Sequence, residues 1–168
     1  GFNLVFKINI IDFLRKKTYL LAKPFEKDNN ILDNLNPQNL ITPKAPKEIV
    51  TPANQQKMIE EVKKLREKDA RLLVSKNYEV FFASATEIPN ILHEIGRLRE
   101  ITFRAIGEGT NQSIDIDKFD RYYHHMFLWD DDNNCLAGAY RMGLGSEIFP
   151  KYGIEGFYLN ELFRFEPE

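Results

Sequence analysis

Cysteine is nearly absent from this sequence, since Cys135 is the only one among 168 residues. A single cysteine excludes an internal disulfide and favours a reducing compartment. Long apolar runs are missing as well: no stretch approaches the roughly 18 apolar residues that cross a bilayer, and the first residues lack the pattern of a signal peptide. We therefore expect a cytoplasmic protein, with peripheral contact at the inner membrane as an alternative.

A strong excess of either charge is also missing. The chain has 23 Lys and Arg against 25 Asp and Glu, a net charge of -2, so it has no general attraction to nucleic acid or to an anionic bilayer. Zinc, nucleotide and nucleic-acid motifs do not occur, and we expect neither a metal nor a permanently bound cofactor. What the sequence does have is apolar: 43% hydrophobic residues, 12% aromatic residues and 13 Phe indicate a folded core.

Composition divides the chain into three parts. Residues 1–23 combine apolar residues at helical spacing with a basic cluster at 15–17, which predicts an amphipathic helix. This helix either docks on the domain, is the closing helix of an upstream domain or touches lipid. Residues 24–51 are rich in Asn, Asp, Pro and Lys, which predicts a linker. Residues 52–168 carry the main domain.

The main domain is predicted to begin with a helix that Thr51 caps and that has Pro52 in its first turn. The buried stripe of this helix is expected at Met58, Val62, Leu65 and Leu72. A strand follows at 78–83, and a second helix, capped by Thr86, extends to about residue 105. The buried stripe of the second helix is expected at Ile88, Leu92, Ile95, Leu98 and Thr102.

A hairpin is predicted next, with strands at 124–129 and 135–144. A short helix at 147–151 and a fourth strand at 157–165 follow. This order of elements predicts an α+β fold with a mainly antiparallel sheet covered by helices. Because the sequence stops after a strand aromatic enough for the centre of a sheet, we expect the fold to be truncated after its fourth strand.

Pairs of polar residues recur at short spacings in the second half of the chain. They are Arg99-x-x-x-Phe103, Asp117-x-x-Asp120, Gly138-Ala-Tyr-Arg141 and Glu161-x-x-Arg164. The predicted helix end, loop and strands that carry them would bury some of the charges, and an unpaired buried charge costs several kcal/mol. We therefore predict that four segments bring these side chains together in one ion-paired site.

In this order, over about 90 residues, the four patterns resemble the first half of the N-acyltransferase fold of the GNAT superfamily. Within that superfamily the chain is most similar to the bacterial ornithine-lipid and glycine-lipid N-acyltransferases, often labelled hemolysin-like, and to the acyl-homoserine-lactone synthases. The string Tyr-His-His-Met-Phe-Leu-Trp-Asp at 123–130 also resembles the lipid enzymes. Residues 11–19 resemble the end of a lysophospholipid acyltransferase domain, which some bacteria fuse ahead of this module.

The resemblance implies transfer of a long acyl chain from an acyl-carrier-protein or coenzyme A thioester to the amine of an amino acid in lipid synthesis. Ornithine or glycine is the expected acceptor, and an acyl carrier protein the expected partner. GNAT enzymes hold the donor with a glycine-rich turn after the strand that here ends near Phe165. Because the sequence given contains no such turn, we expect the segment alone to be inactive.

The same resemblance assigns catalytic roles. Glu161 is the expected general base, because the predicted strand places it on an aromatic face where it would be poorly hydrated. Arg164 would lie at a bulge whose free backbone N-H holds the thioester oxygen. His125 is a candidate proton shuttle. His124 points to the opposite face of the strand, so the two histidines cannot chelate one metal.

The remaining residues are expected to bind the substrate. Asp117 and Asp120 would either fix Arg99 and Arg141 in bidentate ion pairs or bind the amine of the acceptor. Phe103 shares a helix face with Arg99 and would line the same site.

Alternative interpretations remain open. The ion pairs could be scaffold only, in a non-catalytic acyl-carrier or protein-binding module. A signal synthase of the acyl-homoserine-lactone type, acting on S-adenosylmethionine, is a further alternative. A calcium loop at Asp115-x-Asp117 is excluded, because Asp120 stands where such a loop requires Gly and Met126 where it requires Glu.

Overall fold

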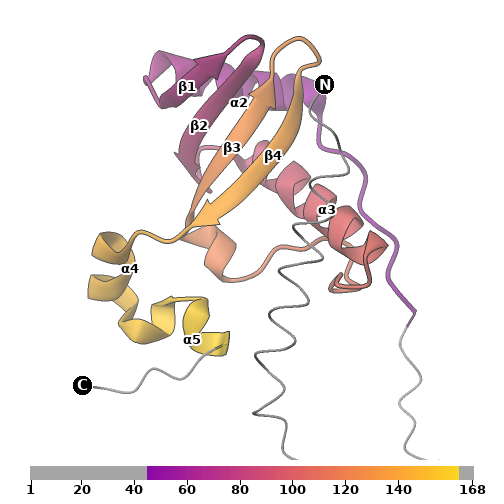
Figure 1. Cartoon of the computed structure of the whole chain (residues 1–168), viewed down its shortest axis with the longest axis vertical. Helices are drawn as coiled ribbons and strands as arrows, with labels where there is room; N and C mark the ends of the chain where they lie inside the picture. The colour runs from indigo at the N-terminus through magenta and orange to yellow at the C-terminus, as the bar shows by residue number, and fades with distance from the viewer. Residues whose placement is uncertain (1–44, 163–168) are drawn as a thin grey trace, which may run out of the picture. The chain divides into compact units, whose positions relative to one another are not determined.

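The computed structural model describes residues 45–162, and Figure 1 shows how their elements are arranged. In chain order these are α2 Gln55–Glu67, β1 Arg71–Ser75, β2 Tyr78–Ser84, α3 Pro89–Ala105, the 3-10 helix η4 Phe119–Arg121, β3 His124–Asp130, β4 Cys135–Met142, α4 Gly145–Tyr152, the 3-10 helix η5 Ile154–Gly156 and α5 Leu159–Leu162.

The four described strands form one antiparallel sheet in the order β1-β2-β3-β4. β1 and β2 make one hairpin, β3 and β4 make another, and α3 lies between them in the chain. Phe81 of β2 is opposite Phe127 of β3, and the centres of their stacked rings are 5.4 Å apart. The predicted α+β fold with an antiparallel sheet is confirmed.

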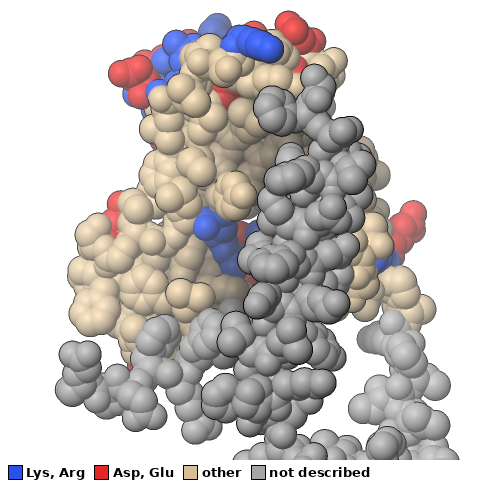
Figure 2. All heavy atoms as spheres, in the orientation of Figure 1, with Lys and Arg blue, Asp and Glu red and all other residues tan. Residues whose placement is uncertain are grey.

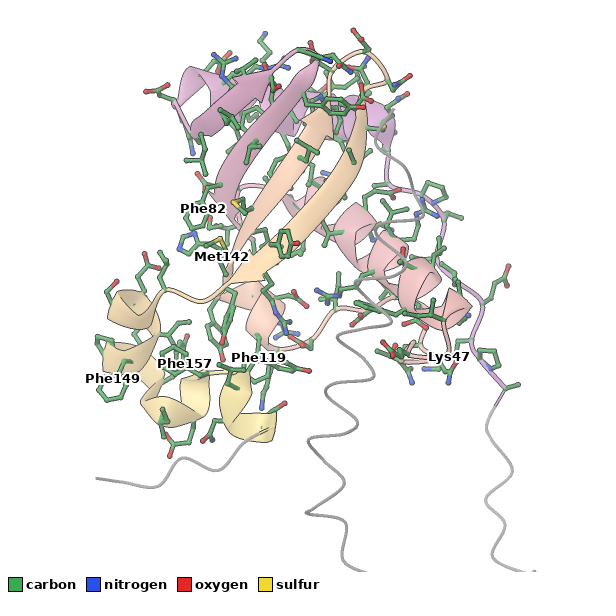
Figure 3. All side chains as sticks on the ribbon, in the orientation of Figure 1. Lys47, Phe82, Phe119, Met142, Phe149 and Phe157 are labelled. Carbon is green, nitrogen blue, oxygen red and sulfur yellow. The ribbon has the colours of Figure 1, made fainter. Side chains whose placement is uncertain are left out.

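The main core lies between the sheet and the two long helices, which cover the same face of the sheet (Figure 1). Its buried members are Met58, Val62, Leu65, Phe81, Ala83, Ile88, Ile91, Ile95, Phe127 and Trp129. Removal of such apolar surface from water is the main force that holds helices on a sheet. Residues that alternate with these, such as Phe82 of β2 and Met142 of β4, point to the other face (Figure 3), where few charged atoms are visible (Figure 2).

The first helix begins later than predicted. Asn54, not Thr51, is its N-cap, because the Asn54 side chain accepts a hydrogen bond from the backbone N-H of Lys57 at 3.1 Å. The helix ends at Glu67, and Asp69 adopts a positive φ of 57° that turns the chain into β1. The strand β1 is not among the predicted elements. Leu72, expected on a buried helical stripe, lies on this edge strand and is 60% exposed.

The second helix also differs from its prediction in detail. It begins at Pro89, and the cap residue is Ile88 without a side-chain bond, so Thr86 is not the N-cap. The helix buries Ile91 and Ile95. Leu98, expected to be buried, is half-buried, and Thr102 is exposed. Leu98 and Thr102 both line a cavity, so part of the stripe that was predicted to be buried in the core is in contact with this cavity.

The predicted strand at 157–165 is wrong over its described residues. Residues 159–162 form α5, a single helical turn. Local bonds explain the difference: the Asn160 N-H donates to the Phe157 carbonyl at 2.9 Å, and the Glu161 N-H to the Tyr158 carbonyl at 3.0 Å. Residues 163–165 lie outside the described part of the chain.

A second, smaller core supports this C-terminal region. Phe119, Tyr123 and Ile148 are buried in it, and Tyr122 and Phe157 pack against them. Figure 3 shows Phe119 and Phe157 between η4 and the α4–α5 segment. The short helices at the end of the chain are therefore anchored to η4.

Residues 45–51, at the end of the predicted linker, contact the loop that follows α3. The Lys47 N-H donates to the Asn111 carbonyl and the Val50 N-H to the Ser113 carbonyl, each at 3.0 Å. This loop forms one wall of the cavity. Within residues 45–162, no helix combines the length and apolar character needed to cross a membrane.

Candidate active site

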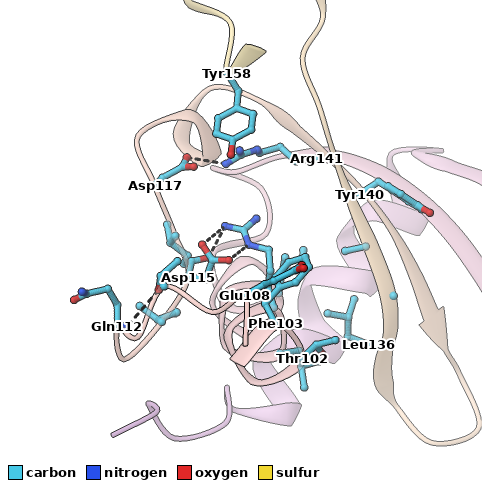
Figure 4. A pocket seen from close by; sticks show the side chains of 18 of the residues that line it. Thr102, Phe103, Glu108, Gln112, Asp115, Asp117, Leu136, Tyr140, Arg141 and Tyr158 are labelled. Carbon is cyan, nitrogen blue, oxygen red and sulfur yellow. Dashed lines mark hydrogen bonds and ion pairs between the residues drawn. The ribbon is translucent and has the colours of Figure 1, made fainter. Parts of the chain in front are cut away.

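A cavity of about 960 Å³ lies between α3, the loop from 106 to 118, and β4 (Figure 4). Its lining is Ile95, Leu98, Arg99, Thr102, Phe103, Glu108, Thr110, Gln112, Ile114, Asp115, Ile116, Asp117, Leu136, Ala137, Gly138, Ala139, Tyr140, Arg141 and Tyr158. Apolar residues of α3 and β4 form much of its wall, while two arginines and several carboxylates also line it. The cavity is therefore amphipathic.

Gly96 allows the loop to approach α3 closely enough to build this site. The Asp115 N-H donates to the Gly96 carbonyl at 3.2 Å, and a Cβ placed on Gly96 would lie only 2.4 Å from Ile116 Cγ1. A larger residue would push the loop away. Glycine at this helical position thus brings Asp115 within reach of Arg99, which is one turn further along α3.

Arg99 is held by two carboxylates. Its Nε donates to Asp115 Oδ2 at 2.9 Å, and its Nη2 donates to Asp115 Oδ1 at 3.2 Å and to the Asp115 carbonyl. Its Nη1 and Nη2 also bond the two oxygens of Asp120, at 3.2 and 2.9 Å. The guanidinium is thus paired on two sides in bidentate geometry.

Arg141 of β4 pairs with the other aspartate of the predicted set. Its Nη1 donates to Asp117 Oδ1 at 2.7 Å and lies 3.2 Å from Asp120 Oδ1. Asp120, whose side chain is fully buried, therefore connects both arginines. The prediction that Asp117 and Asp120 lie with Arg99 and Arg141 in one ion-paired cluster agrees with this geometry.

The ion pairs favour the charged forms of Asp120 and Arg99. Burial by itself would raise the pKa of Asp120, but hydrogen bonds from Arg99 and the Asp117 backbone N-H outweigh it and lower the pKa. Burial likewise opposes the charge of Arg99, and its bonds to Asp120 and Asp115 raise its pKa in spite of this. Three carboxylates face two guanidinium groups, so one negative charge is in excess.

Asp117 differs from the other carboxylates because one of its oxygens is left open. Its Oδ1 accepts from Arg141 Nη1 and from the backbone N-H groups of Phe119 and Asp120, at 2.8 and 3.2 Å, and so caps η4. Within residues 45–162 its Oδ2 has no hydrogen-bond partner, and the side chain is 38% exposed. This oxygen belongs to a residue that lines the cavity.

Aromatic rings surround the guanidinium of Arg141. The Arg141 Cζ atom lies 4.9 Å from the ring centre of Tyr158, 5.5 Å from that of Tyr123 and 5.7 Å from that of Phe119. Such cation–π contacts stabilise a partly desolvated arginine. Figure 4 shows Tyr158 over Arg141, beside Asp117.

His125, the candidate proton shuttle, is buried under this cluster and does not line the cavity. Its Nε2 must carry a proton, because it donates to the Asp120 carbonyl at 3.0 Å. Its Nδ1 is buried without a partner among the described residues. Burial lowers the pKa of His125, which favours the neutral ring. The geometry describes a group that supports Asp120, and its role in proton transfer stays a prediction.

Glu161 does not have the environment that was expected. It lies on α5 and not on a strand, its side chain is 47% exposed, and its Oε1 is 2.6 Å from Lys118 Nζ. The expectation of poor hydration is therefore wrong, while the role as general base stays a prediction. Phe103 lines the cavity as predicted and is 39% exposed. Arg164 lies outside the described residues.

Two site residues were missed from the sequence. Asp115 was considered only as a calcium ligand, although it forms one side of the Arg99 pair. Tyr158 was placed within a strand and given no role. Asp115 follows Arg99 by sixteen residues, and neither helical nor strand periodicity predicts a contact at this spacing. The contact forms because the loop after α3 folds back onto the helix.

The described geometry can be compared with known proteins. Residues 98–168 match the family model described as "Acetyltransferase (GNAT) domain". These residues carry a GNAT domain. The segment contains every predicted site residue and all cavity-lining residues except Ile95. The antiparallel sheet with its helices is consistent with a GNAT-like α+β fold, as the resemblance implied.

Two curated relatives extend the GNAT match towards the N-terminus of the chain. A "Glycine N(alpha)-acyltransferase" of Bacteroides thetaiotaomicron is 31% identical over 122 residues, which are 70% of this chain and 36% of that protein. A protein of the same name from Phocaeicola vulgatus is 34% identical over 110 residues, 63% of this chain and 33% of that protein. The chain thus spans about a third of the length of these relatives. No solved structure matches.

Proposed function

We propose that the GNAT domain of this chain belongs to an N-acyltransferase that moves a long acyl chain from a thioester to the amine of a small amino acid. Homology to two glycine N-acyltransferases supports this reaction. Glycine is therefore the first acceptor to test, with ornithine as the alternative that the sequence patterns suggest. The amphipathic cavity is the proposed meeting point of donor and acceptor.

The reaction needs an amine that has lost its proton. The amine nitrogen attacks the thioester carbonyl, a C-N bond forms, the C-S bond breaks, and the thiol leaves with a proton. The ammonium of the acceptor gives up one proton to a base beforehand. We assign this base to Glu161, which lies near Lys118 at the C-terminal side of the cluster.

The open oxygen of Asp117 is the observation that carries the proposal. Asp117 Oδ1 already accepts three hydrogen bonds, whereas Oδ2 has no partner within residues 45–162. The surrounding cluster has one more carboxylate than guanidinium groups. Such a carboxylate is suited to bind an ammonium group. The hydrogen bond from Arg141 Nη1 to Asp117 Oδ1 fixes the orientation of the Asp117 carboxylate. The acceptor would therefore bind at the end of the cavity that Asp117 and Arg141 form.

The apolar part of the cavity suits the acyl chain. Leu98 and Phe103 of α3 line it together with Leu136 and Ala139 of β4. Roughly 0.8 kcal/mol per buried methylene makes such a surface an effective binding site for a long chain. The donor would be an acyl-CoA, as in GNAT enzymes generally, or an acyl carrier protein, whose bulk would remain outside the cavity.

The test measures acyl transfer by the full-length gene product, with palmitoyl-CoA and palmitoyl-acyl carrier protein as donors. Glycine and ornithine are the acceptors, and mass spectrometry detects the N-acyl product. Asp117→Asn should raise KM for the acceptor by about tenfold or more, because a neutral amide attracts an ammonium less strongly. Asp132→Asn, in the exposed turn between β3 and β4, is the matched control.

Two results would contradict the proposal. The wild-type protein could form no acyl product from any donor and amine, which would favour a non-catalytic module that binds acyl carriers. Alternatively, Asp117→Asn could leave KM for the acceptor unchanged, which would remove Asp117 from the acceptor site. Native mass spectrometry with acyl carrier protein identifies the non-catalytic case directly.

A further inference from the structure

Tyr158 occupies a particular place beside the proposed acceptor site. Its ring centre is 4.9 Å from Cζ of Arg141, the guanidinium that also bonds Asp117 at 2.7 Å. Tyr158 and Asp117 thus contact the same group, and both line the cavity. Figure 4 shows the Tyr158 ring above this end of the cavity.

The ring is held in this place by contacts to another part of the chain. The Tyr158 backbone N-H donates to the Tyr123 hydroxyl at 2.9 Å, and the Tyr122 hydroxyl donates to the Gly156 carbonyl at 2.9 Å. The Tyr158 and Phe119 rings also pack edge to face, with ring centres 5.5 Å apart and planes at 84°. Two hydrogen bonds therefore hold the backbone around Tyr158, and the contact with Phe119 restricts the ring.

The Tyr158 ring, held beside the proposed ammonium-binding carboxylate of Asp117, would limit the space for the acceptor. An amino acid whose ammonium binds the open oxygen of Asp117 would direct its other substituents towards the space next to Arg141. Glycine has no side chain to place there, whereas a larger amino acid would have to displace the Tyr158 ring. Displacement would break the contacts of the ring with Arg141 and Phe119.

We infer that Tyr158 restricts the acceptor of this site to glycine-sized amines. This inference rests on the proposed acyl transfer and adds a specificity-determining residue to it. The side chain acts by its volume, so the ring is needed and the hydroxyl group is not. The substrate class is then an amino acid without a bulky side chain, and not ornithine.

The experiment compares kcat/KM for glycine, alanine, serine and ornithine, with palmitoyl thioester as donor and the full-length protein as enzyme. Tyr158→Ala should raise kcat/KM for alanine relative to glycine by about tenfold, the range that one methyl-sized group typically controls in a pocket. Tyr158→Phe should keep the wild-type ratio. Because both rates are measured on one preparation, partial loss of folded protein cancels from the ratio.

Tyr152 provides a matched control. It stacks on Tyr122 at 4.6 Å in the same aromatic region but does not line the cavity. Tyr152→Ala should leave the glycine-to-alanine ratio unchanged. If Tyr158→Ala aggregates, Tyr158→Leu, which keeps an apolar cover on Phe119, replaces it.

The outcomes separate this inference from the function on which it rests. Absence of product from wild-type protein with all four amines overturns the acyl transfer and the specificity together. Product from wild-type protein with a ratio that Tyr158→Ala or Tyr158→Leu does not change overturns the specificity role alone. A ratio that changes equally in Tyr158→Phe assigns the selectivity to the hydroxyl group and also overturns the steric inference.

Discussion

Arg99 of α3 and Asp120 of η4, 21 positions apart in the chain, form a two-point ion pair with N-O distances of 3.2 and 2.9 Å. The Asp120 side chain is completely buried, and it also lies 3.2 Å from Arg141 of β4. One carboxylate therefore joins the helix, the loop and the sheet at the end of the cavity. These ion pairs hold α3, η4 and β4 together although the three elements are distant in the sequence.

Asp120→Asn should destabilise the fold and remove acyl transfer together. Two arginines would lose their shared carboxylate, and removal of one partner of a buried ion pair typically costs about 3 kcal/mol or more. Urea unfolding followed by circular dichroism measures the loss. Asp132→Asn, an exposed change of the same chemistry, should leave the midpoint in place; an equal midpoint for Asp120→Asn would refute the structural role.

His125 should make the protein less stable at mildly acid pH. Its pKa is lowered in the folded state by burial, so between that value and its ordinary pKa of about 6.5 the unfolded chain binds more protons than the folded one. Stability therefore rises with pH through this window and falls as the pH drops below about 6.5. Protonation would also place a cation near Arg99 and Arg141.

His125→Gln tests this pH dependence, since the amide can still donate to the Asp120 carbonyl and does not titrate. The difference in unfolding free energy between pH 7.5 and pH 5.5 should be smaller in this variant than in the wild type. His93→Gln, at a histidine that bonds the Thr51 carbonyl, is the control and should behave as the wild type. Equal pH dependence in all three proteins would show that His125 does not titrate abnormally.

Ala139→Trp should block the apolar part of the cavity. Ala139 is an exposed residue of β4 that lines the cavity, so an indole ring there fills space that the acyl chain would use without disturbing the buried core. Binding of a fluorescent long-chain acyl-CoA should weaken about tenfold or more. Cys135→Trp adds the same ring to an exposed position of β4 outside the cavity and should bind as the wild type does. Equal affinity in both variants would place the acyl chain elsewhere.

Glu161→Gln tests the assignment of the general base. Because Glu161 is exposed and its ion pair within residues 45–162 is with the exposed Lys118, the urea midpoint should not change. Loss of a general base lowers kcat by about a hundredfold or more, with little change in acceptor KM. Full acyl transfer by this variant with every amine tested would exclude the assignment.

Local patterns were sufficient to predict much of the fold. The β2, β3 and β4 strands, the hairpin turn and α4 follow from alternation, turn residues and apolar spacing, and they lie close to the predicted positions. These signals operate over a few residues, so they do not depend on the rest of the chain. The first helix begins later than predicted because Asn54 caps it in place of Thr51. The edge strand β1 was missed because Leu72 continues the apolar spacing of the preceding helix.

The residues of the site were partly predictable for a related reason. Arg99, Asp117, Asp120 and Arg141 were recognised because charges in a helix end, a loop and a strand require partners. Pairing of the two aspartates with the two arginines was one of the expected alternatives, but the part of Asp115 was not predictable. Asp115 reaches Arg99 only because the loop folds back onto Gly96, which is a contact between distant parts of the chain.

The sequence by itself determined the types of most elements and the set of charges that must be neutralised, because helical and strand periodicity and charge pairing are local properties. Tertiary structure alone decided that Tyr158 covers Arg141, that Asp117 keeps one oxygen open and that Glu161 faces solvent. Phe157, Tyr158 and Leu159 suit either a strand or a turn. Their packing on Phe119 and Tyr123 selects the turn, and such long-range contacts leave no period in the sequence.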